Sequence, residues 1–358
     1  MANIFDYLAW RGDLPLEVSP FNSVDGVILA RLAYLPFDAV LPDESAACSV
    51  QDAAQAILAA PERCFNESDV QLMEQLSQSP RFRDLQLTGF VDLLDEETQF
   101  CALTIRLDPQ NLFLSFRGTD NTLVGWKEDF NMSFVCPVPA QTLALAYLER
   151  TAARLEGAIR MGGHSKGGNL AVYAGAFCGE AIQNRIVEIY NYDGPGFDQQ
   201  VLDDPGYDAI CQRVQTFVPK SSVVGMMLGH EEQYTIVDSS QMGVMQHNIY
   251  SWDVYGPDFV RLEQVNNSSR FMDFTLKAWL RDMAPAQREV FFDAVYRILE
   301  QTNAKTFREV TENLPQNAVI IAKTVKNLDE DTRKAVTHAL GLLFKSARTG
   351  LSQMIQNR

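Results

Sequence analysis

Ser165 is the residue of this chain whose neighbours point most directly to chemistry. It is the centre of G-H-S-K-G at 163–167, a form of G-x-S-x-G. A short apolar run at 158–162 precedes it, and a run typical of a helix follows at 167–177. On such a strand-to-helix turn a serine hydroxyl stands clear of the backbone and can act as a nucleophile. We therefore predict that Ser165 is catalytic, although a serine here could also cap the helix.

A serine nucleophile needs a general base, which is usually histidine because its pKa lies near operating pH. The chain has four histidines. His164 is a poor candidate because it lies inside the turn, and His338 is a poor candidate because it lies in a C-terminal helical pattern. In hydrolases of this type the base follows the last strand. His247 comes nine residues after a predicted strand that ends at Asp238. We favour His247, with His230 as the alternative.

The base in turn needs a partner that orients its ring, normally a carboxylate. The loop at 220–225 reads K-S-S-V-V-G and offers none. Asp193, at the end of the preceding predicted strand, is our preferred acid, and Asp238 is the second candidate. Asp193 would equally fit as a turn residue opening Gly-Pro-Gly. A third possibility is that Ser222 or a backbone carbonyl orients the histidine.

Two hydrogen-bond donors should stabilise the negative oxygen that forms during acyl transfer. One is expected from the backbone N–H of Lys166, directly after the nucleophile. The other is expected from Thr119, in the R-G-T-D loop that follows the predicted strand at 111–116. Each such donor lowers the barrier by roughly 3 kcal/mol.

Three sequence blocks resemble those of class-3 lipases. They are L-S-F-R-G-T-D at 114–120, G-W-K-E-D-F at 125–130 and G-H-S-K-G-G-N-L-A at 163–171. Over most of its length the chain resembles the bacterial Mbeg1-like family, through F-D-Y-L-A-W-R-G-D at 5–13, D-G-P-G-F at 193–197, and Q-H at 246–247 followed by S-W at 251–252. The resemblance implies an α/β-hydrolase fold and a lipase-like serine esterase.

The chain departs from the lipase pattern at two places. Class-3 lipases carry their acid where this sequence reads Ser221-Ser222, and an apolar residue where it has Lys166. A cation on the first turn of a helix opposes the helix dipole. Lys166 is therefore expected to pair with Asp129 or Glu128 or to meet an anionic substrate, and the alternative is a solvated lysine.

The surrounding elements should form an α/β fold with a mixed, mainly parallel sheet. Helical patterns dominate residues 1–80, and strands with an antiparallel start follow from residue 85. Strands and helices then alternate, which favours parallel pairing with helices on both faces. From residue 266 the patterns are helical only. We expect a hydrolase domain at 1–265 and a helical region at 266–358 packed on it, with predicted helices at 271–284, 286–300, 304–312, 315–326 and 329–353.

Composition narrows the possible partners. Hydrophobic residues make up 46% of the 358 residues and the net charge is −16, so we expect no nucleic-acid binding. No long apolar run and no signal peptide are visible, which favours a cytoplasmic protein without stable membrane insertion. The six cysteines form no CxxC pair and should be reduced, and no metal or other cofactor is expected. Oligomeric state is left open.

Two functions follow. The first is a serine hydrolase that cleaves an acyl ester, a thioester or a small lipid through an acyl-enzyme on Ser165. The second is a non-catalytic interaction protein built on a hydrolase scaffold, which the missing acid and Lys166 favour. Peptidase or acyltransferase activity is a third possibility.

Overall fold

The computed structural model describes residues 2–95, 98–119, 131–132, 135–222, 224–265, 271, 274–275, 278–279, 282–302 and 314–356. The chain divides into two compact units. The first comprises residues 1–93, 100–118 and 140–266, and the second 94–99, 119–139 and 267–358.

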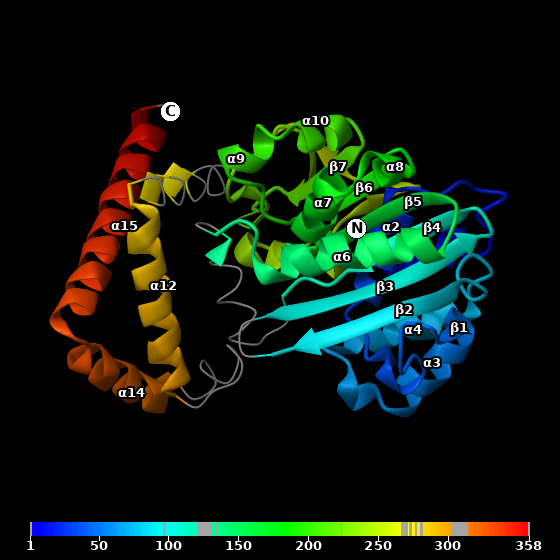
Figure 1. Ribbon diagram of the computed structural model, residues 1–358, viewed down its shortest axis with the longest axis horizontal. Coiled ribbons are helices and arrows are strands. Elements are labelled where there is room, and N and C mark those ends of the chain that lie inside the picture. The colour runs from blue at the N-terminus through cyan, green and yellow to red at the C-terminus, as the bar shows by residue number, and fades with distance from the viewer. Residues whose placement is uncertain are drawn as a thin grey trace. The chain divides into compact units, whose positions relative to one another are not determined.

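A nine-stranded sheet is the centre of the first unit (Figure 1), with the strand order β1-β2-β3-β4-β5-β6-β7-β8-β11. β3 pairs antiparallel with β4, the neighbours from β4 to β8 are parallel, and β11 closes the far edge antiparallel to β8. The predicted mixed, mainly parallel sheet is therefore confirmed. Its strands are β1 (Ala47–Ser49), β2 (Gln86–Leu94), β3 (Gln99–Asp108), β4 (Asn111–Phe116), β5 (Ala158–His164), β6 (Ile186–Tyr192), β7 (Val214–Pro219), β8 (Tyr234–Val237) and β11 (Arg261–Leu262), and β9 (Val254–Tyr255) pairs separately with β10 (Asp258–Phe259).

Crossover helices cover one face of the sheet. Right-handed crossovers between successive neighbouring strands place their helices on the same side. Gly175 of α7 lies against Ile189 of β6, whose next residue, Tyr190, points to the other face. The helices of this stretch are α6 (Pro139–Arg154), α7 (Lys166–Phe177), α8 (Glu180–Gln183), α9 (Gln199–Leu202) and α10 (Pro205–Cys211).

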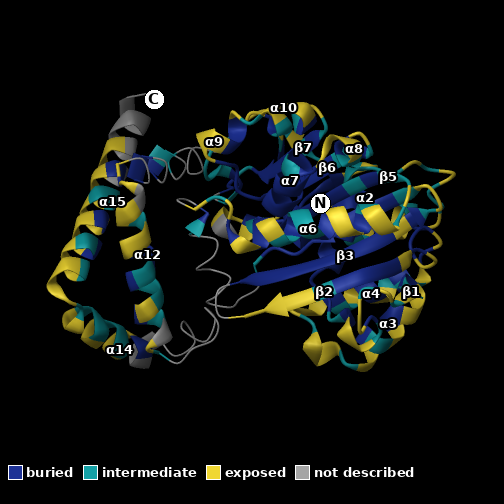
Figure 2. Cartoon of the chain, viewed as in Figure 1, coloured by how far each residue is buried: buried dark blue, intermediate teal, exposed yellow. Residues whose placement is uncertain are grey.

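The N-terminal segment covers the opposite face. Gly26 in α2 approaches the rings of Tyr190 and Tyr192, and α2 also packs on β4 and β5. This explains the helical patterns of residues 1–80, because a strictly sequential parallel sheet leaves its second face for another segment to cover. Figure 2 shows the buried central strands between the layers. The helices are α1 (Ile4–Arg11), α2 (Ser23–Leu32), α3 (Val50–Ala59) and α4 (Glu67–Gln78), with short 3₁₀ turns η1 (Phe37–Ala39) and η2 (Pro61–Arg63).

In the described part of the second unit there are three long helices: α12 (Pro285–Glu300), α14 (Leu314–Asn327) and α15 (Glu330–Gln356). Trp279 is the largest side chain of its core, and its indole N–H donates to Ala339 O at 2.8 Å. The predicted helices at 286–300, 315–326 and 329–353 are confirmed. The one predicted at 304–312 lies outside the described residues.

Some short elements escaped the sequence patterns. β11, α9 and α10 were not predicted, because two to seven residues are too few to show a hydrophobic period. None of the six cysteines forms a disulfide bond. Among the helices that the structure describes, none combines the length and apolar content needed to cross a membrane.

Candidate active site

Ser165 occupies a strained turn between β5, which ends at His164, and α7, which begins at Lys166. Its φ of 58° and ψ of −136° are unusual for a residue with a side chain. Its backbone N–H donates to Tyr192 O at 2.9 Å, which fixes the turn on the neighbouring strand. Ser165 occupies the N-cap position of α7, as the sequence allowed, but its side chain makes no capping hydrogen bond to the helix.

The glycines of the motif allow this turn to close. A Cβ on Gly163 would lie 2.4 Å from Phe116 O, and one on Gly167 would lie 2.0 Å from the same oxygen. Both distances are far shorter than any tolerated contact. The turn is therefore packed directly against the end of β4, which carries the loop predicted to hold the oxyanion donor.

Asp193 follows β6 and is fully buried. Its φ of 55° aims its carboxylate into the layer formed by the strand ends, a conformation that aspartate tolerates better than most residues. Oδ1 accepts hydrogen bonds from the Ser222 hydroxyl and, at 3.2 Å, from the Gly225 N–H. Oδ2 lies 2.6 Å from His247 Nδ1. Asp193 is thus placed to orient the imidazole.

His247 ends the 3₁₀ turn η4 (Gly243–His247), and its side chain is 30% exposed. With Asp193 ionised, Nδ1 must be the donor, so a neutral ring carries its lone pair on Nε2. The ring packs against that of His164 in a tilted arrangement, with centroids 4.4 Å apart, which places it beside the turn of Ser165. No hydrogen bond joins Ser165 Oγ to His247, both of which are described. Such bonds are often long before substrate binds.

The alternative residues are engaged elsewhere. His230 Nδ1 lies 2.8 Å from Glu232 Oε1 and its Nε2 lies 2.9 Å from Gly225 O, so both ring nitrogens face acceptors. Asp238 pairs with Lys220 and accepts from its neighbour's N–H rather than from a histidine. Ser222 contacts Asp193, where it supports the carboxylate instead of replacing it.

The predicted oxyanion loop lies against the nucleophile. A Cβ on Gly118 would come within 3.0 Å of Ser165 Cβ. Thr119 is the next residue in the chain and the last one described before 131. Lys166 supplies the first N–H of α7, where helix N–H groups lack intrahelical partners and the dipole is positive.

The Lys166 side chain is buried, with only 1% exposed, so the alternative of a solvated lysine is wrong. Its two candidate partners, Asp129 and Glu128, lie outside the described residues.

Tyr34 was not predicted, and it connects the parts of the site. It lies just beyond α2, and its hydroxyl accepts from the Gly118 N–H at 2.9 Å. The same hydroxyl donates to His164 O at 3.1 Å. No sequence signal marks it, since a tyrosine in an apolar helical run is ordinarily a core residue.

His164 remains neutral. Burial, and then the nearby His247 and Arg31, lower the pKa of His164 well below its ordinary value. Its Nε2 can therefore donate to His247 O, at 2.7 Å, while Nδ1 keeps a lone pair facing Tyr34.

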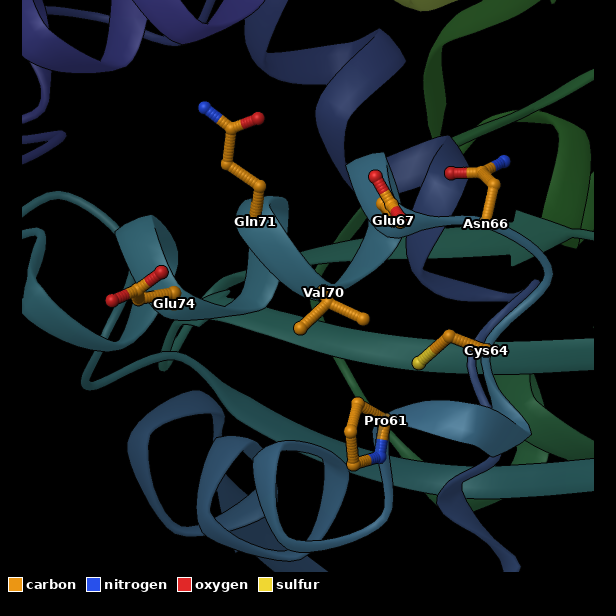
Figure 3. A pocket seen from close by; sticks show the side chains of 7 residues that line it. All are labelled: Pro61, Cys64, Asn66, Glu67, Val70, Gln71 and Glu74. Atoms are coloured by element: carbon orange, nitrogen blue, oxygen red, sulfur yellow. The ribbon is translucent and has the colours of Figure 1, made fainter.

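One hollow in the described part of the chain lies away from Ser165. Its volume is about 480 Å³ and it opens between η2 and the start of α4. Figure 3 shows Pro61, Cys64 and Val70 around it, with Glu67 and Glu74 on α4. None of the residues around Ser165 lines it. Because neither Ser165 nor His247 lines it, we do not assign it to the proposed reaction. Within the described ranges, no histidine, cysteine or carboxylate cluster could hold a metal ion.

Comparison with known families gives one match. The model of the Mbeg1-like family matches residues 76–297, which is more than half of the chain and includes Ser165, Asp193 and His247. The chain belongs to this family. A search of curated proteins found no match.

Proposed function

We propose that this member of the Mbeg1-like family is a serine hydrolase that cleaves an acyl ester, a thioester or a small lipid. The observation that carries the proposal is the 2.6 Å contact between His247 Nδ1 and the buried Asp193, with the His247 ring packed against His164, the residue before Ser165. A buried carboxylate fixes the tautomer of the ring and stabilises its cation, as a general base requires. The relation of the family to lipases is part of this proposal.

The reaction would proceed through an acyl-enzyme. Ser165 Oγ attacks the substrate carbonyl while His247 Nε2 accepts its proton, and Asp193 stabilises the resulting imidazolium. The backbone N–H of Lys166, with Thr119, receives the negative oxygen. Collapse of the intermediate expels the alcohol or thiol, which takes the proton from His247. Water then attacks the acyl-enzyme by the same route and regenerates Ser165.

A fluorophosphonate probe tests the proposal, because it phosphonylates only an activated serine. We expect labelling of the native protein at Ser165, located by peptide mass spectrometry, and no labelling of Ser165→Ala. Ser240→Ala serves as a matched control, since this serine hydrogen-bonds to Ser251 O and does not contact Asp193 or His247. Absence of labelling, while a known serine hydrolase reacts in the same tube, would contradict the proposal.

A second candidate is a non-catalytic interaction protein on the same scaffold. It is favoured by the absence of a hydrogen bond between the described residues Ser165 and His247. Under this candidate the Asp193–His247 pair is only a structural contact. The two candidates differ in one result: a structural pair gives no probe labelling, whereas a catalytic one does.

A further inference from the structure

Tyr34 links two loops that the proposed reaction needs. Its side chain is buried, and its single hydroxyl makes two backbone hydrogen bonds: it accepts from Gly118 N–H and donates to His164 O. Gly118 belongs to the loop that leads to Thr119, and His164 directly precedes the nucleophile. A phenol can fill both roles because its oxygen donates and accepts at once.

His164 extends the connection to the base. Its Nε2–H donates to the backbone carbonyl of His247 at 2.7 Å, and the two rings are in tilted contact. A path of three hydrogen bonds, which passes through the backbone and the ring of His164, therefore runs from Gly118 through Tyr34 to the backbone carbonyl of His247. It joins the oxyanion loop, the nucleophile turn and the base.

A buried ion pair fixes the tyrosine ring. The Arg31 guanidinium lies 4.2 Å from the centroid of the Tyr34 ring and forms two hydrogen bonds with Asp69, of 2.7 and 2.9 Å. Asp69 also accepts from the Tyr250 hydroxyl at 2.6 Å, three residues beyond His247. The N-terminal helices thus hold Tyr34 and the base-bearing segment in one network.

We propose that Tyr34, acting through His164, is a positioning residue that holds the oxyanion loop and His247 in register with Ser165. This inference rests on the proposed hydrolase function. It adds to that site a residue, Tyr34, that the N-terminal helical segment supplies. The two backbone hydrogen bonds of Tyr34 go to Gly118 and His164, and its proposed role is to position the reacting groups. Its effect is geometric, and displacement of reacting groups by about 1 Å can cost on the order of 100-fold in rate.

Tyr34→Phe tests the proposal because it removes the hydroxyl and keeps the ring on Arg31. We expect kcat for a p-nitrophenyl ester, and the rate of fluorophosphonate labelling, to fall about 10- to 100-fold, with KM changed less than about 3-fold. Tyr147→Phe is the matched control. That buried hydroxyl contacts Thr104 and Gly89 O at 2.7 and 2.8 Å on β3 and β2, and its loss should leave kcat unchanged. Equal kcat for Tyr34→Phe and wild type would overturn the proposal.

A second measurement separates this inference from the hydrolase proposal. The short His247–Asp193 hydrogen bond should give a low-field imidazole proton in the NMR spectrum. We expect Tyr34→Phe to shift this proton and speed its exchange with water, and Tyr147→Phe to leave it unchanged. If the probe does not label wild type, the hydrolase proposal fails. If the low-field proton does not move in Tyr34→Phe, the positioning role is rejected as well. Should Tyr34→Phe not fold, His164→Phe breaks the same path at its third bond, from His164 Nε2 to His247 O, and carries both measurements.

Discussion

At the scale of single residues, the site depends on which carboxylate meets His247. One carboxylate oxygen of Asp193 contacts His247 Nδ1, and the other accepts hydrogen bonds from Ser222 and Gly225. A carboxylate held in this way stays in place when the histidine gains its proton. The donors around Asp193 therefore hold the carboxylate in the position that orients the imidazole, and they also solvate its buried charge.

Asp193→Asn should lower kcat/KM for an acyl ester about 10³- to 10⁴-fold, because an amide favours the wrong histidine tautomer and cannot stabilise the imidazolium. Steady-state assays at pH 7 check this expectation. Asp238→Asn is the control, since Asp238 pairs with Lys220 at the surface, and it should change the rate less than about 3-fold. The reverse order of effects would make Asp238 the acid.

Glu232 gives a pH-dependent prediction. Burial would raise its pKa, but contacts with His230 and the hydroxyls of Thr216 and Tyr207 outweigh burial and lower the pKa to about 2, from an ordinary value of 4.5. Since the folded pKa lies below the unfolded one, the carboxylate stabilises the fold fully above pH 4.5. That contribution is lost as the pH falls from 4.5 toward 2. It amounts to roughly 3 kcal/mol at neutral pH.

Glu232→Gln should therefore lower the free energy of unfolding by roughly this amount at pH 7, and its deficit relative to wild type should shrink below pH 4.5. Urea denaturation at several pH values measures both. Glu231→Gln removes an exposed neighbouring charge and should change stability by less than about 0.5 kcal/mol. A deficit for Glu232→Gln that stays constant down to pH 3 would contradict the assigned pKa.

At the scale of elements, the strand-turn-helix unit of β5 and α7 is fixed by close backbone packing. Gly167 stands inside the first turn of α7, where alanine would ordinarily favour a helix. Here the added methyl would meet Phe116 O and C at 2.0 and 2.8 Å. Contact with the end of β4 therefore overrides helix propensity.

Gly167→Ala should destabilise the protein by about 1–3 kcal/mol or more and slow the labelling of Ser165, because the turn must move away from β4. Urea unfolding and probe kinetics measure the two effects. Gly179→Ala, at the start of α8, is the control: no atom lies within 4 Å of its added Cβ, so stability should stay within about 0.5 kcal/mol. Equal stability for the two variants would refute the packing argument.

At the scale of the whole first unit, buried ion pairs tie the N-terminal helices together. Arg81 Nε donates to Asp25 Oδ1 at 2.8 Å, and both side chains are fully buried. Arg81 also donates to the carbonyls of Leu14, Ser19 and Pro20. One guanidinium thus joins α2, the preceding loop and the chain beyond α4, in the layer that supplies Tyr34.

Asp25→Ala should cost about 3–5 kcal/mol, because it leaves a buried cation without its counter-charge. Asp38→Ala removes one partner of the exposed Arg63–Asp38 pair and should cost no more than about 1 kcal/mol. Chemical denaturation of both variants checks the difference. Similar costs would mean that Arg81 finds sufficient compensation in the three carbonyls alone.

Much of the fold and of the candidate site was predictable from local sequence. Alternating and apolar runs gave the strands and the long helices, since these periods are local properties of the chain. The glycine-flanked Ser165 and the His247 and Asp193 candidates came from motif, chain order and the scarcity of histidines. The short β11, α9 and α10 were missed because they are held by neighbours rather than by a pattern of their own.

By itself, the sequence determined the mixed α/β architecture, the turn around Ser165 and a small set of candidate partners for Ser165. The tertiary structure decided which carboxylate lies beside His247, that His230 is engaged by Glu232, and that Tyr34 joins Gly118 to His164. The physical reason is that hydrogen bonds between residues distant in the chain depend on the positions of strand ends and loops. Those positions result from packing of the whole sheet between its two helical layers.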